Sequence, residues 1–132
     1  MKGIDTNILI RYLTQDDPIQ SPKATEIIER GLTPERPGFV SLVTVAEVVW
    51  VLGSVYALAD REIADTVERM LQADTLMLQN EQQIFTAMVA LKEGWGGFAD
   101  ALIAALGVWA GCESTLTFDK KALRLAGFEL LD

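Results

Sequence analysis

The sequence opens with Lys2-Gly3-Ile4-Asp5-Thr6-Asn7-Ile8-Leu9-Ile10-Arg11-Tyr12-Leu13, a short apolar run that leads through cap-type residues into a helical stretch. The run 2–4 has the length and composition of a strand. Asp5, Thr6 and Asn7 all favour the N-cap of a helix. The same order of short apolar run and helical stretch recurs along the chain, and such alternation predicts a parallel sheet covered by helices, an α/β fold.

The apolar periodicity assigns the remaining elements. Strands are predicted at Lys2–Ile4, Gly38–Val40, Leu76–Leu78, Ser114–Phe118 and Phe128–Leu131. Helices are predicted at Thr6–Leu13, Ser21–Leu32, Leu42–Leu58, Arg61–Gln72, Glu81–Lys92, Phe98–Gly111 and Lys120–Leu125. With 132 residues, half of them apolar, and no convincing linker, the chain is expected to form one domain over residues 1–132.

Charged residues bear on where the protein resides. Asp5 and Arg11 interrupt the apolar stretches near the start, so no secretory signal is predicted and the expected location is the cytoplasm. The segment 39–59 approaches the ~20 residues of a bilayer-spanning helix. Glu47 in its middle would cost about 2.5–3.5 kcal/mol in lipid. We therefore expect a helix buried on all sides in a soluble core, and no membrane partner.

The sequence has no histidine and a single cysteine. Ser-His-Asp and Cys-His catalysis and the usual zinc sites are therefore excluded. Cys112 lies in an apolar stretch, where a small buried residue without a chemical role is expected. The chemistry that remains is that of carboxylates, hard oxygen ligands that suit Mg²⁺ or Mn²⁺.

Two acids stand where a strand passes into a helix. Asp5 follows the first strand and Asp119 follows the run that ends at Phe118. Either could simply cap the next helix. In open α/β sheets, however, ligands bind at the carboxyl ends of strands, so two acids at two such ends indicate one crevice.

Two further acids lie inside apolar helices. Glu47 is flanked by valines and alanine, so we expect little access to solvent and no capping role. A buried carboxylate is normally neutralised, paired or bound to a cation. Asp100 is the only charged side chain in residues 98–111. A favourable position in the first helical turn is the alternative explanation for it, worth only ~0.3–1 kcal/mol. If the four acids converge, they need a cation, and a divalent metal would activate water and stabilise charge on a phosphodiester.

The order of these residues carries a family resemblance. Asp5-Thr6-Asn7, then Glu47, then Ala99-Asp100-Ala101-Leu102-Ile103-Ala104-Ala105, then Thr117-Phe118-Asp119 resembles the PIN-domain nucleases, and more closely the VapC-type toxins of toxin-antitoxin pairs. Each motif alone is weak, but the resemblance spans essentially the whole chain.

The resemblance implies a three-layer α/β/α sandwich with a central, mostly parallel sheet. It implies a metal-dependent endoribonuclease with Asp5, Glu47, Asp100 and Asp119 as catalytic residues. Mg²⁺ or Mn²⁺ would be held by Asp5, Asp100 and Asp119, chiefly the first two. Asn7 and Thr117 match polar positions that support the carboxylates. RNA as substrate, a cognate antitoxin and a homodimer are the implied partners. Lys121 stands where several relatives carry a further acid, so the resemblance leaves open whether the site holds one metal ion or two.

The net charge of −8 disfavours nonspecific nucleic-acid binding, because phosphate contacts supply most of that affinity. RNA would therefore be met by local positive charge, for which Arg11, Lys120 and Lys121 are candidates, although ordinary solvated side chains are the alternative. Trp95 lies in a glycine-rich loop before Asp100, where it could contact substrate or form a lid.

Two rival functions use similar residues. A receiver-type Mg²⁺-binding module needs paired acids near the first strand, and Asp5 has no acidic neighbour. A phosphatase of the haloacid dehalogenase type needs an aspartate where Asn7 stands. A catalytically silent PIN-like scaffold stays open as an interaction module.

Overall fold

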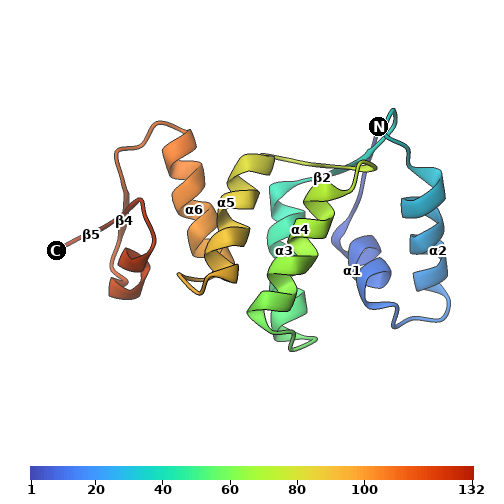
Figure 1. Cartoon of the computed structure of the whole chain (residues 1–132), viewed down its shortest axis with the longest axis horizontal. Coiled ribbons are helices and arrows are strands. Elements are labelled where there is room, and N and C mark those ends of the chain that lie inside the picture. Colours follow the sequence, from blue (N-terminus) through green and yellow to red (C-terminus); the bar gives the residue numbers. More distant parts are fainter. The chain divides into compact units, whose positions relative to one another are not determined.

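The computed structural model describes residues 1–132. Its elements, of which Figure 1 labels the larger ones, are β1 (Lys2–Gly3), α1 (Thr6–Thr14), α2 (Gln20–Glu26), η1 (Ile27–Gly31), β2 (Gly38–Val40), α3 (Leu42–Ser54), α4 (Asp60–Gln72), β3 (Leu76–Leu78), α5 (Glu81–Lys92), α6 (Phe98–Trp109), β4 (Thr115–Thr117), η2 (Lys120–Arg124) and β5 (Phe128–Leu130). Here η1 is a π-helical turn and η2 a 3₁₀ turn. All predicted elements are present, with ends displaced by at most a few residues except in α3, which is four residues shorter at its carboxyl end than predicted.

The chain divides into two compact units. The N-terminal unit comprises Met1–Leu58 and Arg69–Gln79, and the C-terminal unit comprises Ala59–Glu68 and Asn80–Asp132. Each unit contains a parallel sheet and helices, as the alternation of the sequence predicts. The single domain over 1–132 stays a prediction.

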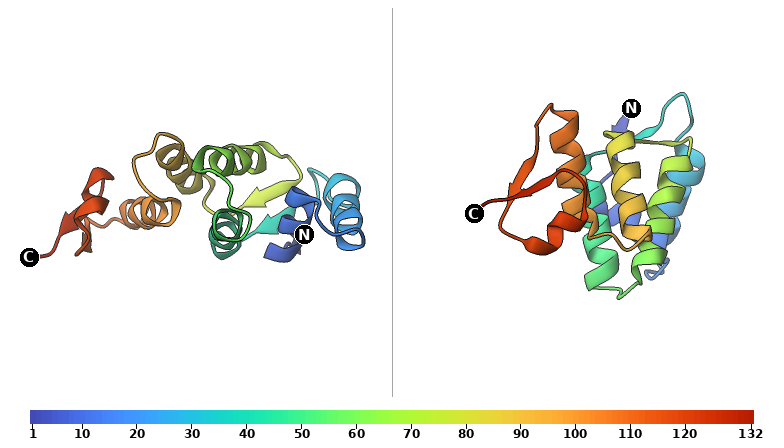
Figure 2. Two further views of the ribbon diagram at one scale, coloured as in Figure 1. Left: turned by 90° about the horizontal axis from the view of Figure 1, so that it is seen from below. Right: turned by 60° about the vertical axis from the view of Figure 1, so that its left-hand side comes forward.

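In the N-terminal unit, the three strands form a parallel sheet in the order β1-β2-β3. Figure 2 (left) shows the arrows of β2 and β3 side by side. Val40 and Leu78 are paired neighbours on these strands and both are buried. Helix α1 packs against α2 and α3, and its Leu9 is fully buried. The unit therefore has its own apolar core beneath the strand ends.

Helix α3 differs from its prediction. Val43, Glu47 and Trp50 recur at helical spacing and are all exposed, Val43 by 71% and Trp50 by 67%. The opposite side, with Val45, Val48 and Leu52, is buried. The expected burial on all sides is wrong, because a helix that is apolar all round does not reveal from sequence which face its neighbours cover. No helix in the chain combines the length and apolar character needed to span a bilayer.

The C-terminal unit is built on the helix pair α5 and α6, which pack side by side (Figure 2). Met88 and Phe98 are among its buried side chains. Strands β4 and β5 form a parallel pair that follows α6. A Cβ on Gly107 would come within 2.6 Å of Thr115 Oγ1, so glycine permits this close approach of α6 and β4. Cys112, expected to be buried, is exposed at the loop between them.

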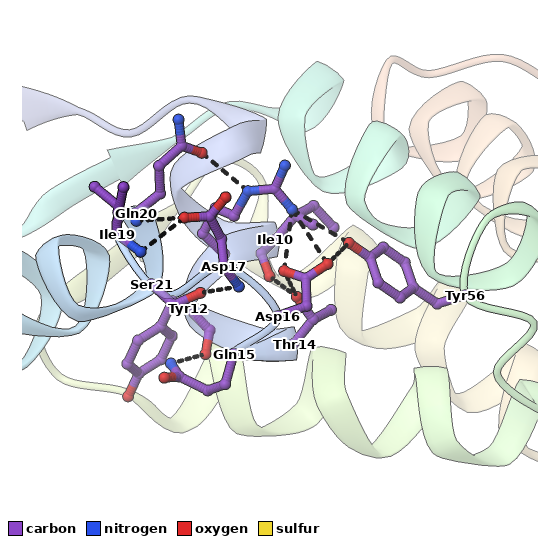
Figure 3. Close-up of polar contacts among 11 residues, drawn as sticks. Ile10, Tyr12, Thr14, Gln15, Asp16, Asp17, Ile19, Gln20, Ser21 and Tyr56 are labelled. Atoms are coloured by element: carbon purple, nitrogen blue, oxygen red, sulfur yellow. Dashed lines mark hydrogen bonds and ion pairs between the residues drawn. The ribbon is translucent and has the colours of Figure 1, made fainter.

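A polar network fixes the loop after α1 in the N-terminal unit (Figure 3). Tyr56 Oη donates a 2.6 Å hydrogen bond to Asp16 Oδ2, and Thr14 Oγ1 donates to Asp16 Oδ1 at 2.8 Å. Arg11 Nη1 forms an ion pair with the same carboxylate at 3.0 Å. The Tyr56 and Thr14 hydroxyls, and then the Arg11 guanidinium, lower the pKa of Asp16 to about 2.

We expect Tyr56→Phe to raise the pKa of Asp16 and to lower the free energy of unfolding at neutral pH. Because the folded pKa of Asp16 lies below its ordinary value of 3.8, its contribution to stability is present above that value and is lost as pH falls towards about 2. Denaturant unfolding at pH 7 and pH 2 measures this. The difference between the two proteins should be smaller at pH 2 than at pH 7, and an equal difference at both values would contradict the role of Asp16 ionisation.

Candidate active site

Two of the predicted acids lie together in the N-terminal unit. Asp5 is the N-cap of α1, and its Oδ1 accepts a 2.7 Å hydrogen bond from the backbone N–H of Thr6. Thr6 Oγ1 donates a hydrogen bond of the same length to Glu47 Oε1 on α3. One threonine thus binds a carboxylate from each of two helices that pack against each other. The capping interpretation of Asp5 is correct, and it does not exclude a further role.

Charge compensation is missing at this pair. Asp5 and Glu47 are both exposed, and neither forms an ion pair with a lysine or arginine. The predicted burial of Glu47 is therefore wrong, and the cost of an unpaired buried charge does not apply to it. Two neighbouring carboxylates without a cation nevertheless raise the negative potential at this point, which favours a bound cation.

The other two acids lie in the C-terminal unit. Asp100 is exposed in the first turn of α6, where the helix dipole favours a negative charge, and its carboxylate makes no hydrogen bond or ion pair. Asp119 is the N-cap of η2, and its Oδ1 accepts a 2.9 Å hydrogen bond from the backbone N–H of Lys121. Thr117 Oγ1 accepts from the backbone N–H of Asp119 at 3.1 Å. Thr117 therefore supports the loop that carries Asp119.

The carboxylates of the four acids can be compared with the ligands that a Mg²⁺ ion requires. No three acidic, histidine or cysteine side chains form a group that could hold an ion, and each unit contributes two of the four predicted acids. Mg²⁺ is usually held by only one or two carboxylates, with water and substrate phosphate completing its shell. The carboxylates of Asp5 and Glu47 fit that requirement chemically. The convergence of all four acids stays a prediction.

The predicted RNA-binding residues lie in different surroundings. Arg11 is half-buried and bound to Asp16, Tyr56 and Gln20, so much of its charge is already neutralised within the protein. Lys120 and Lys121 are exposed and form no ion pair. The side chain of Trp95 is half exposed. Contact of these residues with RNA stays a prediction.

Thr6 contacts both acids of the candidate site in the N-terminal unit, and the sequence does not reveal this. Asn7 was expected to support the carboxylates, but it makes no hydrogen bond to an acid, and the adjacent threonine provides that contact instead. The position of Thr6 beside Asp5 indicates a cap, whereas its bond to Glu47 joins residues 41 positions apart. No local pattern could have shown that bond.

The sequence was compared with known protein families. The PIN domain family matches residues 3–128, which is nearly the whole chain. The match agrees with the parallel strands and helices described above and confirms the predicted α/β/α fold class. No curated protein matches the chain significantly. The chain belongs to the PIN domain family, a nuclease fold whose members are generally metal-dependent ribonucleases.

Proposed function

We propose that this protein is an Mg²⁺- or Mn²⁺-dependent endoribonuclease and that Asp5, Glu47, Asp100 and Asp119 form its active site. The observation that supports this most directly is the exposed carboxylate pair of Asp5 and Glu47, bound to one threonine and compensated by no positive side chain. Membership of a nuclease family supports the same reaction class. Phosphodiester hydrolysis is a reaction that carboxylates and a divalent ion can perform without histidine.

The residues of the chain have separable tasks in this proposal. Thr6 holds Asp5 through its N–H and Glu47 through its hydroxyl, so the two carboxylates are oriented before substrate arrives. Glu47 Oε2 makes no hydrogen bond within the protein and is free to accept a proton from the attacking water. Asp100 lies in the first turn of α6, at the positive end of the helix dipole. A divalent ion held by Asp5, Asp100 and Asp119 would stabilise the charge that develops on the phosphodiester.

We further propose that the protein is the toxin of a VapC-type toxin-antitoxin pair, acts in the cytoplasm and forms a homodimer. The resemblance of the four acidic motifs supports this. An antitoxin would neutralise the site by placing an arginine among the carboxylates, because its planar donors can bind several oxygens at once. Growth arrest on inducible expression, relieved by the neighbouring open reading frame, is the expected behaviour. A silent scaffold or a receiver-type Mg²⁺-binding module would cause no arrest of this kind.

The experiment that tests the enzymatic proposal is cleavage of single-stranded RNA by the purified, partner-free protein. We expect cleavage with Mg²⁺ or Mn²⁺ and none with excess chelator. Addition of Mg²⁺ beyond the chelator should restore it, which serves as the control for irreversible damage. Cleavage that resists the chelator would contradict the metal-dependent site. Absence of cleavage under every condition would favour the scaffold.

A further inference from the structure

A cavity of about 480 Å³ lies on the helix pair of the C-terminal unit, outside the acidic residues. This volume falls in the range of about 300–1,000 Å³ that is typical of small-ligand sites. Its floor is made of alanines, including Ala104 and Ala105 of α6, and two tryptophans, Trp95 and Trp109, line it. The alanines leave the space open and the tryptophans bring large apolar surfaces to it.

Both tryptophans are accessible to a ligand. Trp95 is 51% exposed and Trp109 is 66% exposed. The loop that carries Trp95 is nevertheless held in place. The Trp95 backbone N–H donates to the Ala90 carbonyl oxygen at 2.9 Å, and Arg124 Nη2 donates to the Gly94 carbonyl oxygen at 3.0 Å. A preformed aromatic surface loses little conformational freedom when it binds. The loop therefore has the character of a fixed platform rather than of a lid.

The polar side of the cavity comes from α5. The Gln82 side chain makes no hydrogen bond within the protein, so its amide offers both donors and an acceptor. Thr86 Oγ1 donates to the Gln82 carbonyl oxygen at 3.0 Å and keeps its acceptor capacity. No charged side chain lines the cavity. The ligand must accordingly be uncharged where it enters, with a flat apolar face and a polar edge.

We propose that this cavity binds an unpaired nucleobase of single-stranded RNA. Base faces stack on tryptophan regardless of sequence, and their edges can use the amide of Gln82. Ala101 and Ala104 of α6 both line the cavity. Ala101 directly follows Asp100, and Ala104 lies four residues after Asp100, about 6 Å along the helix axis. The cavity thus begins beside Asp100 on α6, close enough to receive a base next to the nucleotide at the proposed active site. This inference rests on the proposed ribonuclease function, of which it describes the substrate contact.

An apolar helix of a protein partner would fit the cavity less well. Its side chains would cover Gln82 and Thr86 without replacing the hydrogen bonds that these groups make with water, which is unfavourable. A phosphate would find no positive side chain here. A nucleobase can stack on the tryptophans and form hydrogen bonds with the amide of Gln82.

The test measures binding of an eight-nucleotide single-stranded RNA to the full chain in chelator, through quenching of tryptophan fluorescence. An RNA of the same length with abasic riboses is the matched probe. We expect the abasic RNA to bind at least about fivefold more weakly, the lower end of what base–aromatic stacking contributes. Equal affinity for the two RNAs, or no binding of either, would overturn the proposal.

Variants locate the contact. Ala105→Leu fills the cavity from its floor, and Trp95→Ala removes one aromatic surface at an exposed loop; each should lower the affinity for the normal RNA at least about fivefold. Ala110→Leu adds the same atoms at an exposed position beyond the end of α6, outside the cavity, and should bind like wild type. If neither cavity variant weakens binding, the base is not bound there. These measurements use no cleavage, so their failure is distinguishable from failure of the proposed enzymatic function.

Discussion

Asp5→Asn is expected to lower RNA cleavage by at least 100-fold, on the order of 3 kcal/mol of transition-state stabilisation, while the stability of the fold stays unchanged. The reason is that Asp5 has two separable roles. Its Oδ1 caps α1 by accepting the Thr6 N–H, and asparagine caps a helix about as well as aspartate. Only the negative charge is lost, and the proposed divalent cation requires that charge.

The matched variants separate these two roles. Asp5→Ala removes the cap as well as the charge and should cost about 0.5–2 kcal/mol of stability in addition to activity. Asp74→Asn, at an exposed acid outside the candidate site, should change neither quantity. The measurements are kcat/KM on single-stranded RNA with Mg²⁺ and denaturant unfolding of each variant. A near-normal rate in Asp5→Asn would reduce Asp5 to a capping residue.

Asp100→Asn tests the proposed catalytic role of an acid that belongs to the C-terminal unit. Its carboxylate is exposed and makes no hydrogen bond or ion pair, so the substitution removes neither. The loss of a favourable dipole interaction should cost at most about 1 kcal/mol. A loss of cleavage comparable to that of Asp5→Asn would support a shared role of the two acids in catalysis.

Local sequence signals predicted the helices and strands well where residues that start or end such elements flank them. Helix α5 runs from Glu81 to Lys92 as predicted, and the glycine-rich loop follows it, although Asn80 before it is left-handed and makes no capping hydrogen bond with its side chain. Helix α3 ends at Ser54 rather than Leu58, although residues 55–58 are apolar. Tyr56 instead turns towards Asp16, and Ala57 adopts a left-handed conformation with φ of 55°. That ending depends on a partner 40 residues away, which no local pattern contains.

The candidate site was predictable in its residue types but not in its contacts. The absence of histidine and the positions of Asp5 and Asp119 at strand ends indicated carboxylate chemistry, and both acids are indeed caps. The inference from burial at Glu47 failed, since a side chain in the middle of an apolar helix can still lie on its exposed face. What joins Glu47 to Asp5 is Thr6, whose hydroxyl donates to Glu47 in a tertiary contact and whose backbone N–H donates to Asp5.

Glu47→Gln is expected to reduce cleavage about 100-fold or more while changing the stability of the metal-free protein by no more than about 0.5 kcal/mol. Glutamine keeps the volume of the side chain and an oxygen that can accept the Thr6 hydroxyl. It cannot accept a proton at neutral pH, and it removes one of two neighbouring charges. The exposure of Glu47 explains why the effect on stability is small.

The rise in unfolding temperature that Mg²⁺ causes is a second measurement on Glu47→Gln. If Glu47 contributes to the negative potential that attracts Mg²⁺, an excess of the ion should raise the unfolding temperature of wild type more than that of Glu47→Gln. A ligand that binds only the folded state at 100 times its dissociation constant stabilises it by about 2.7 kcal/mol. Thermal unfolding of both proteins in chelator and in excess Mg²⁺ at pH 7.5 measures the difference. Asp74→Asn, which removes one exposed charge outside the candidate site, is the matched control and should keep the Mg²⁺ effect. The opposite result would be a Glu47→Gln protein that cleaves RNA normally but whose free energy of unfolding in chelator is lower by more than about 1 kcal/mol. Glu47 would then be a structural partner of Thr6, because a carboxylate needed only for its hydrogen bond affects stability and not turnover.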